Sequence, residues 1–249
     1  MVDEMIRVYS PAYFHHLRVE IKKMNATLKL VKYCSVEFPR KRILLPYRLL
    51  GKSAGEVREI QLEESAIRRL TQDQFTRKYL SILKTQRLEK KRNFLEVKNQ
   101  VKNSLEKRHL KILPYAEEID SIKTVEYFKR LRQNCISKMT GEKLKPSAIH
   151  ELRMLLKEFF YNIEILNPES KTALKKINLL QDLIGKWHDY SVIIKHLDNF
   201  KRRTRQSLRN IAQLQIARSG FAAKSSLLIS RINKEKNEAI SELHQLTLS

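Results

Sequence analysis

The sequence is poor in residues that break helices or crosslink the chain, because its 249 residues include only 5 glycines, 6 prolines and 2 cysteines. So few glycines and prolines leave few places to turn, which argues against a many-stranded β fold and for long helices. Cys34 and Cys135 are too few for a disulfide framework, and their separation is not a metal-ligand spacing. The sequence therefore predicts an all-α protein of a reducing compartment.

Long apolar runs are also missing. No uncharged apolar stretch approaches the length of about 18 residues that a membrane span requires. The first ten residues carry Asp3 and Glu4 and no apolar segment. We therefore expect a cytoplasmic, soluble protein with no membrane span. The hydrophobic share of 42% provides enough apolar material for a sizeable core. This argues against disorder of the whole chain.

Acidic residues are strongly outnumbered. The chain has 50 Lys and Arg against 27 Asp and Glu, which gives a formal net charge of +23 and a pI near 10.0. A field of this size attracts polyanions but says nothing about the fold. The candidate partners are nucleic acid, anionic lipid, acidic protein and free polyphosphate, and charge alone does not choose among them.

Prolines and glycines divide the chain into about eight expected helices with short connections, which is typical of a helical bundle. Ser10 is a good N-cap residue for a helix that begins at Pro11. The first helix is expected to stop before Pro39, and Pro114 is expected to end a later one. The expected helices cover 11–37, two helices within 56–113, then 119–139, 146–166, 171–184, 190–205 and a last segment to 246, with breaks at Pro46, Gly51, Gly55 and Gly185.

An internal repeat is the most informative feature of the sequence. The segments that start at Pro11 and Pro146 each place a histidine four residues after the proline, an arginine three residues later and a lysine one turn beyond the arginine. On a helix these three side chains lie within about 60° of one another, beside the apolar face. The repeated residues are His15, Arg18 and Lys22 in the first copy and His150, Arg153 and Lys157 in the second, and the apolar faces are Leu17, Ile21, Met24 and Leu28, and Leu152, Leu156, Phe159 and Ile163.

This pattern suits an extended polyanion. Each histidine falls near the first turn of its helix, where free N–H groups and the helix dipole favour an anion. Arginine and lysine at helical-turn spacing supply fork-like and point-like donors to a chain of phosphates. Histidine adds a donor whose charge rises below about pH 6.5, so we expect binding to strengthen on acidification.

The duplicated His-x-x-Arg-x-x-x-Lys pattern in a basic, all-helical chain resembles the CHAD family, the conserved histidine α-helical domain. The second copy continues through Lys157 to Tyr161 as the family's second motif does, and residues 180–189 are similar to its leucine, glycine and aspartate signature. The first copy matches at His15, Arg18, Val19, Lys22 and Lys23, residues 49–51 resemble the glycine signature, and residues 213–224 loosely resemble the last helix.

The first copy departs from the family pattern. Gly55 stands where the first half would carry an aspartate equivalent to Asp189, and Asn25 takes a position where a basic residue is expected. In the second copy, Phe160 also takes a position where a basic residue is expected. Little sequence precedes the first motif helix, so we expect the first bundle to be incomplete or divergent and the affinity to be lower than that of the family.

The resemblance implies a single domain over 1–249 made of two repeats, about 1–118 and 119–249. Each repeat would be a four-helix-type half, related to the other by pseudo-symmetry around a shared basic groove that binds inorganic polyphosphate, with association with polyphosphate or storage granules. Tyr161 either donates a neutral hydrogen bond from this face or packs as a half-buried core residue. The expected binding residues are His15, Arg18, Lys22, Lys23, His150, Arg153, Lys157 and Tyr161.

Other arrangements point to no catalytic or metal site. His188 and Asp189 have no serine, cysteine or second carboxylate at a recognised spacing, so we expect a structural turn there, with Asp189 capping a helix or pairing with an arginine. His15, His16 and His150 lack carboxylates or cysteines at ligand spacing and share their face with cations. No Gly-rich phosphate loop is present. We therefore expect a non-enzymatic protein with no metal and no cofactor.

Two other functions stay open at this stage. A nucleic-acid-binding protein could use the same basic surface, although no stacking platform or recognition helix is visible. Aromatic residues make up only 8% of the chain. A scaffold for acidic proteins or granule surfaces would need an exposed apolar face, which the sequence does not show. The basic run 201–205 is expected to be a solvated face or an auxiliary anion contact.

Overall fold

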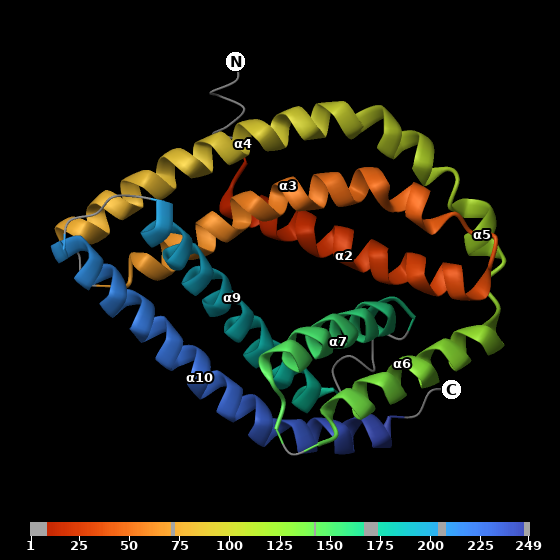
Figure 1. Ribbon diagram of the computed structural model, residues 1–249. Coiled ribbons are helices and arrows are strands. Elements are labelled where there is room, and N and C mark those ends of the chain that lie inside the picture. Colours follow the sequence, from red (N-terminus) through yellow and green to blue (C-terminus); the bar gives the residue numbers. More distant parts are fainter. Residues whose placement is uncertain (1–8, 71–72, 142, 167–173, 204–207, 247–249) are drawn as a thin grey trace. The chain divides into compact units, whose positions relative to one another are not determined.

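The computed structural model describes residues 9–70, 73–141, 143–166, 174–203 and 208–246. Every regular element in these ranges is a helix, so the all-α fold is confirmed (Figure 1). The helices are α2 (Pro11–Cys34), α3 (Arg40–Ile67), α4 (Gln74–His109), α5 (Leu113–Glu117), α6 (Ser121–Met139), α7 (Pro146–Leu166), α9 (Lys175–Arg203) and α10 (Leu208–Gln245). None of the helices described is long and apolar enough to cross a membrane.

The predicted helix starts at the prolines are confirmed. α2 begins at Pro11 after Ser10, whose hydroxyl accepts a hydrogen bond from the Tyr13 amide at 3.3 Å. α7 begins at Pro146, where the fixed φ of proline suits the first helical position. Between α6 and α7 the chain turns through Gly141, which has φ +121°, a conformation that favours glycine. The local signals therefore place both motif helices correctly.

The expected breaks around Pro46, Gly51 and Gly55 are wrong, because α3 runs without interruption from Arg40 to Ile67. The glycines allow a close approach of α2 instead: a Cβ built on Gly51 would lie 3.2 Å from Cγ2 of Ile21. Pro46 is buried in the second turn of α3. Packing of the two helices thus outweighs the local preference of these residues.

The break at Gly185 and the turn at His188 and Asp189 are also wrong. α9 continues from Lys175 to Arg203, so Asp189 lies in the interior of this helix and not at its end, and its pairing with an arginine stays a prediction. A glycine inside a helix costs about 1 kcal/mol relative to alanine. Burial of Leu180, Ile184 and Trp187 on this helix outweighs that penalty. Similarly, α4 ends at His109, and Pro114 lies within α5 rather than at the end of α4.

The chain forms two compact units, each built from three segments. Unit 1 comprises residues 1–25, 39–116 and 197–217, and unit 2 comprises 26–38, 117–196 and 218–249. α2 therefore begins in unit 1 and ends in unit 2. The organisation as one domain of two repeats divided near residue 118 stays a prediction.

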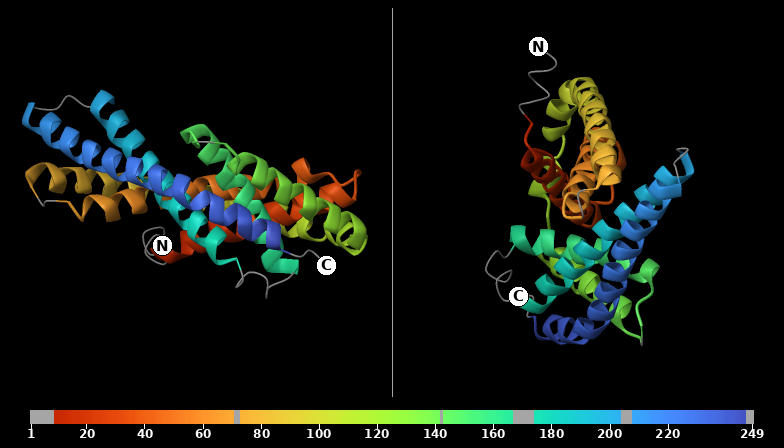
Figure 2. Two further views of the ribbon diagram at one scale, coloured as in Figure 1. Left: turned by 90° about the horizontal axis from the view of Figure 1, so that it is seen from below. Right: turned by 90° about the vertical axis from the view of Figure 1, so that its left-hand side faces the viewer.

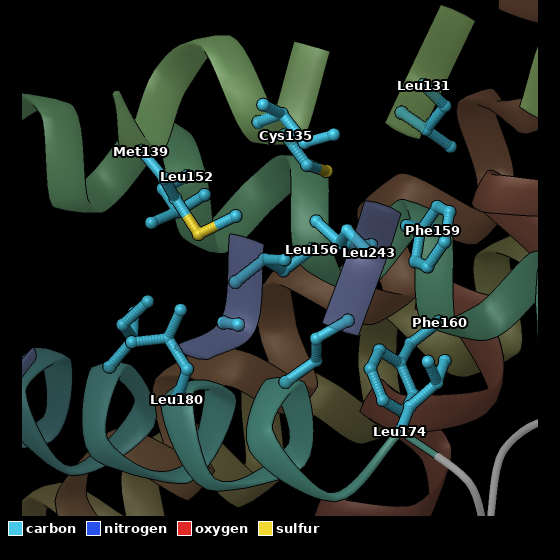
Figure 3. Packing of buried hydrophobic residues seen from close by; sticks show 14 of the residues in the cluster. Leu131, Cys135, Met139, Leu152, Leu156, Phe159, Phe160, Leu174, Leu180 and Leu243 are labelled. Carbon is cyan, nitrogen blue, oxygen red and sulfur yellow. The ribbon is translucent and has the colours of Figure 1, made fainter. Parts of the chain in front are cut away.

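Unit 2 is built around a large apolar core to which α2, α6, α7, α9 and α10 contribute. Leu152, Leu156 and Phe159 of α7 are buried in this core, as the repeat predicted (Figure 3), and Ile163 is buried there too. Glu158 anchors the end of α2 to this core: its carboxylate pairs with Lys29 and accepts a hydrogen bond from the Tyr127 hydroxyl at 2.6 Å. The predicted apolar face of the second motif helix is thus confirmed.

Unit 1 is held together by the pairing of α3 with α4, which lie side by side in Figures 1 and 2. Its core joins Phe14 of α2 to Leu50, Val57 and Phe94. Of the predicted α2 face, Leu28 is buried, whereas Leu17, Ile21 and Met24 are only partly buried. Two acidic residues of α3 are buried with partners. The Tyr79 hydroxyl donates to Glu63 at 2.6 Å and Arg87 pairs with Glu64 at 3.0 Å.

Leu156→Ala tests the apolar face of α7. Leu156 has no exposed surface. We therefore expect the variant to lower the free energy of unfolding by about 2–5 kcal/mol. Met154→Ala is the control on the same helix, because Met154 is 50% exposed. The control should change stability by only about 0.5 kcal/mol. Urea unfolding followed by circular dichroism measures both, and equal destabilisation by the two variants would contradict the orientation of α7.

Candidate functional site

The first group of predicted site residues lies on α2 and is called the α2 stripe: His15, Arg18, Lys22 and Lys23. His15 is exposed, while the arginine and both lysines are half-buried. All four belong to unit 1. Lys23 lies 3.5 Å from Glu20 on the same helix. The structure therefore keeps the arginine and the two lysines at the margin of the core and not in free solvent.

An aromatic cluster fixes the start of α2 and with it the position of His15. The rings of Tyr9, Tyr13, Phe14 and Phe94 pack together, with centroids 4.5 Å apart for Tyr9 and Tyr13 and 5.1 Å apart for Phe14 and Phe94. The Lys98 ammonium donates a hydrogen bond to the Tyr9 hydroxyl at 2.7 Å, which raises the pKa of that lysine. The N-terminal end of the α2 stripe is thus tied to α4.

Arg18 lies against α3. Its side chain is 23% exposed, and its Nη1 is 3.8 Å from Oε1 of Glu59. Beneath the guanidinium lies Gly55, where a Cβ would be 3.1 Å from Cζ of Arg18. The predicted arginine of the first copy therefore has a defined place on the surface of α3.

Arg40 is a residue that sequence reasoning missed. It is the first residue of α3, and its Nη2 donates a hydrogen bond to Oδ1 of Asn25 at 2.6 Å. Its Nε is buried and has no hydrogen-bond partner among the described residues. Asn25 lies one turn beyond Lys22, at the place where the family pattern expects a basic residue. Arg40 thus brings a guanidinium to that place from the next helix, and no local pattern could have revealed it.

The second group lies on α7 and is called the α7 stripe: His150, Arg153, Lys157 and Tyr161. It repeats the exposure pattern of the α2 stripe, with an exposed histidine followed by half-buried residues. All four belong to unit 2. The half-burial of Tyr161 agrees with either of its expected roles, and a contact with ligand stays a prediction. Because the two stripes belong to different units, a groove shared by them also stays a prediction.

The acidic residue of the second motif is held by a neighbouring helix. Lys138 of α6 donates a hydrogen bond to the carboxylate of Glu151, and this contact holds the pKa of Glu151 below its ordinary value. Glu151 therefore stays ionised while its charge is balanced by Lys138.

His188 of α9 is brought against His150. The two ring centroids are 5.8 Å apart, with an angle of 39° between the planes. His188 is half-buried. Sequence reasoning placed it in a turn and missed this contact. The signal that could have found it is the apolar spacing of Ile177, Leu180, Ile184 and Trp187, which continues at a helical period through Gly185.

Contacts from α10 hold the segment that leads into α7. Oδ1 of Asn233 accepts a hydrogen bond from the Leu144 amide at 2.7 Å. The buried ammonium of Lys236 donates to the carbonyl of Gly141. These contacts position the first turn of α7, and therefore His150, relative to the core of unit 2.

The remaining candidates are surface residues or form no site. Lys201 and Arg202 are exposed, as expected for a solvated face, whereas Thr204 and Arg205 lie outside the described residues. Within the described ranges, no three His, Cys, Asp or Glu residues cluster in a way that could hold a metal ion. Both cysteines are free and buried.

Comparisons with known proteins agree with the resemblance. The family model for the CHAD domain matches residues 3–198. The crystal structure of the CHAD domain from the plant Ricinus communis is similar in fold, with a TM-score of 0.76 over 96% of this chain and 83% of that chain at 15% sequence identity. No curated protein matches the chain. Since the family model covers well over half of its residues, the chain belongs to the CHAD domain family.

Proposed function

We propose that this protein is a non-enzymatic binding module for inorganic polyphosphate, and that the α2 and α7 stripes are its ligand contacts. The observation that carries the proposal is the exposure pattern that the two stripes share. Each has an exposed histidine at the first turn and a half-buried arginine and lysine on the following turns. Membership of the CHAD domain family supports a role related to polyphosphate.

The half-burial matters because surface lysines and arginines are mostly exposed. A long side chain kept at the margin of the core has lost part of its conformational freedom before a ligand arrives. Less entropy is then lost on binding, which favours affinity. The α2 and α7 stripes therefore differ from an ordinary solvated face such as Lys201 and Arg202.

The chemistry of the stripes fits a linear polyanion. Successive turns of a helix rise by about 5.4 Å, so residues on one face present cations in a row. Arg18 and Arg153 can each donate two parallel hydrogen bonds to phosphate oxygens, and the lysines add compact charges. Arg40 and His188, which the tertiary structure brings beside the stripes, add a guanidinium and an imidazole to the proposed site.

The same contacts suit a location at polyphosphate or storage granules, where the ligand is concentrated. We propose granule association as a consequence of polyphosphate binding and not as a separate activity. Nucleic acid could be bound by charge alone, and it is distinguished from polyphosphate by the competition experiment below.

The role of the α7 stripe in binding is tested by Arg153→Ala combined with Lys157→Ala. Charge-assisted hydrogen bonds contribute about 1.5–3 kcal/mol each, so we expect at least about a tenfold loss of affinity for long polyphosphate. The control is Lys201→Ala combined with Arg202→Ala, which removes the same two residue types from an exposed surface. Titration calorimetry at fixed salt measures both, and equal losses would show that binding depends on charge density alone.

Acidification is expected to strengthen binding. An ordinary histidine gains its charge as the pH falls through about 6.5, so affinity for polyphosphate should rise between about pH 7.5 and 5.5. His15→Gln combined with His150→Gln should reduce this rise, because glutamine does not titrate and the variant leaves only the imidazole of His188 in the proposed site. A pH profile that is unchanged in the double variant would remove both histidines from the site.

Competition separates polyphosphate from nucleic acid. If the contacts suit a thin, flexible chain of phosphates, long polyphosphate should displace duplex DNA at physiological salt, and DNA should displace polyphosphate poorly. Binding by counterion release alone depends on the number of neutralised phosphates and not on the kind of polymer. Equal displacement per unit of charge in a fluorescence anisotropy assay would therefore favour non-specific polyanion binding.

A further inference from the structure

Gly55 lies directly beneath Arg18, where α2 contacts α3. Gly55 lies in the middle of α3 and is buried. A Cβ at this position would be 3.1 Å from Cζ of Arg18 and nearer still to Nη1. Favourable contacts between carbon atoms begin at about 3.5 Å. The guanidinium therefore occupies space that the side chain of any other residue would fill.

Glu59, one turn further along α3, completes the surroundings of Arg18. Its Oε1 is 3.8 Å from Nη1 of Arg18. This is an ion-pair distance but is too long for a hydrogen bond. The carboxylate attracts the guanidinium at this distance without a direct hydrogen bond to Nη1. Arg18 is thus held against α3 by shape and by charge.

The two copies of the repeat differ at this position. Asp189 follows Gly185 by four residues on α9, and Gly55 follows Gly51 by four residues on α3. The second copy therefore has a carboxylate where the first has no side chain at all. A glycine is also unfavourable inside a helix, so its presence in α3 needs a reason other than helix stability.

We propose that Gly55 is a positioning residue of the α2 stripe. Its missing side chain forms the slot that holds the guanidinium of Arg18 in the orientation in which it contacts the phosphate chain. This inference rests on the proposed function and adds the residue that orients its first arginine. Any side chain at position 55 displaces the guanidinium, while the backbone of α3 gains helix propensity from the substitution.

The test is Gly55→Ala, with Gly220→Ala as the matched control. Gly220 also lies inside a helix, α10, and a Cβ there would meet no atom within 4 Å. We expect Gly55→Ala to weaken the binding of a linear polyphosphate of one defined length by about three- to tenfold. Gly220→Ala should leave affinity unchanged. Thermal unfolding is the second readout, and Gly55→Ala should not lower the midpoint, because alanine favours the helix.

A double-variant cycle shows whether Gly55 acts through Arg18. In a chain that already carries Arg18→Ala the slot is empty, so adding Gly55→Ala should cause no further loss of affinity. The proposed role of Gly55 is overturned if Gly55→Ala binds polyphosphate as the unmodified chain does, or if the losses of affinity in Gly55→Ala and Arg18→Ala simply add. It is also overturned if the loss of affinity in Gly55→Ala comes with a lowered unfolding midpoint.

Failure of the slot is distinguishable from failure of the proposed function. If the Arg153 and Lys157 variant loses affinity as expected but Gly55→Ala or Arg18→Ala does not, only the slot is overturned. If the unmodified chain does not bind polyphosphate, or the variants of the α7 stripe and the exposed control lose affinity equally, the proposed function fails and the slot fails with it.

Discussion

Each motif helix carries an apolar face and a cationic stripe side by side. Burial of the apolar face determines where the cationic stripe lies. On α7 the fully buried Leu152 and Leu156 are immediate neighbours in sequence of Arg153 and Lys157. Because successive residues on a helix are about 100° apart, the two cations are held at the edge of the core. A rotation of α7 that moved the stripe into solvent would also expose its leucines, so core packing and stripe position are coupled.

Polar contacts at the edge of the core also restrict the register of the motif helices. Glu158, which follows Lys157, pairs with Lys29 and accepts a hydrogen bond from Tyr127. A largely buried carboxylate without such partners would be strongly destabilising, so this contact tolerates little sliding of α2 or α7. Together with Lys236 and Asn233 of α10, it holds both ends of the α7 stripe.

Several acidic residues act as partners between helices. Glu63 and Glu64 are buried against Tyr79 and Arg87, Glu151 is paired with Lys138, and Glu59 faces Arg18. Each of these contacts ties one helix to another. Glu59 offsets part of the charge of a stripe residue, Arg18, whereas the other three carboxylates have partners outside the stripes.

The sequence by itself determined the helical class, the starts of α2 and α7, and the buried and cationic faces of α7, since these follow from residue spacing and local capping. It did not determine that α3 and α9 are continuous, because the packing energy of a whole helix exceeds the penalty of a single glycine or proline. Nor could it show Arg40 beside Asn25, His188 beside His150 or Gly55 beneath Arg18. Those pairs are separated by a turn or a helix along the chain, and only tertiary packing brings their side chains together.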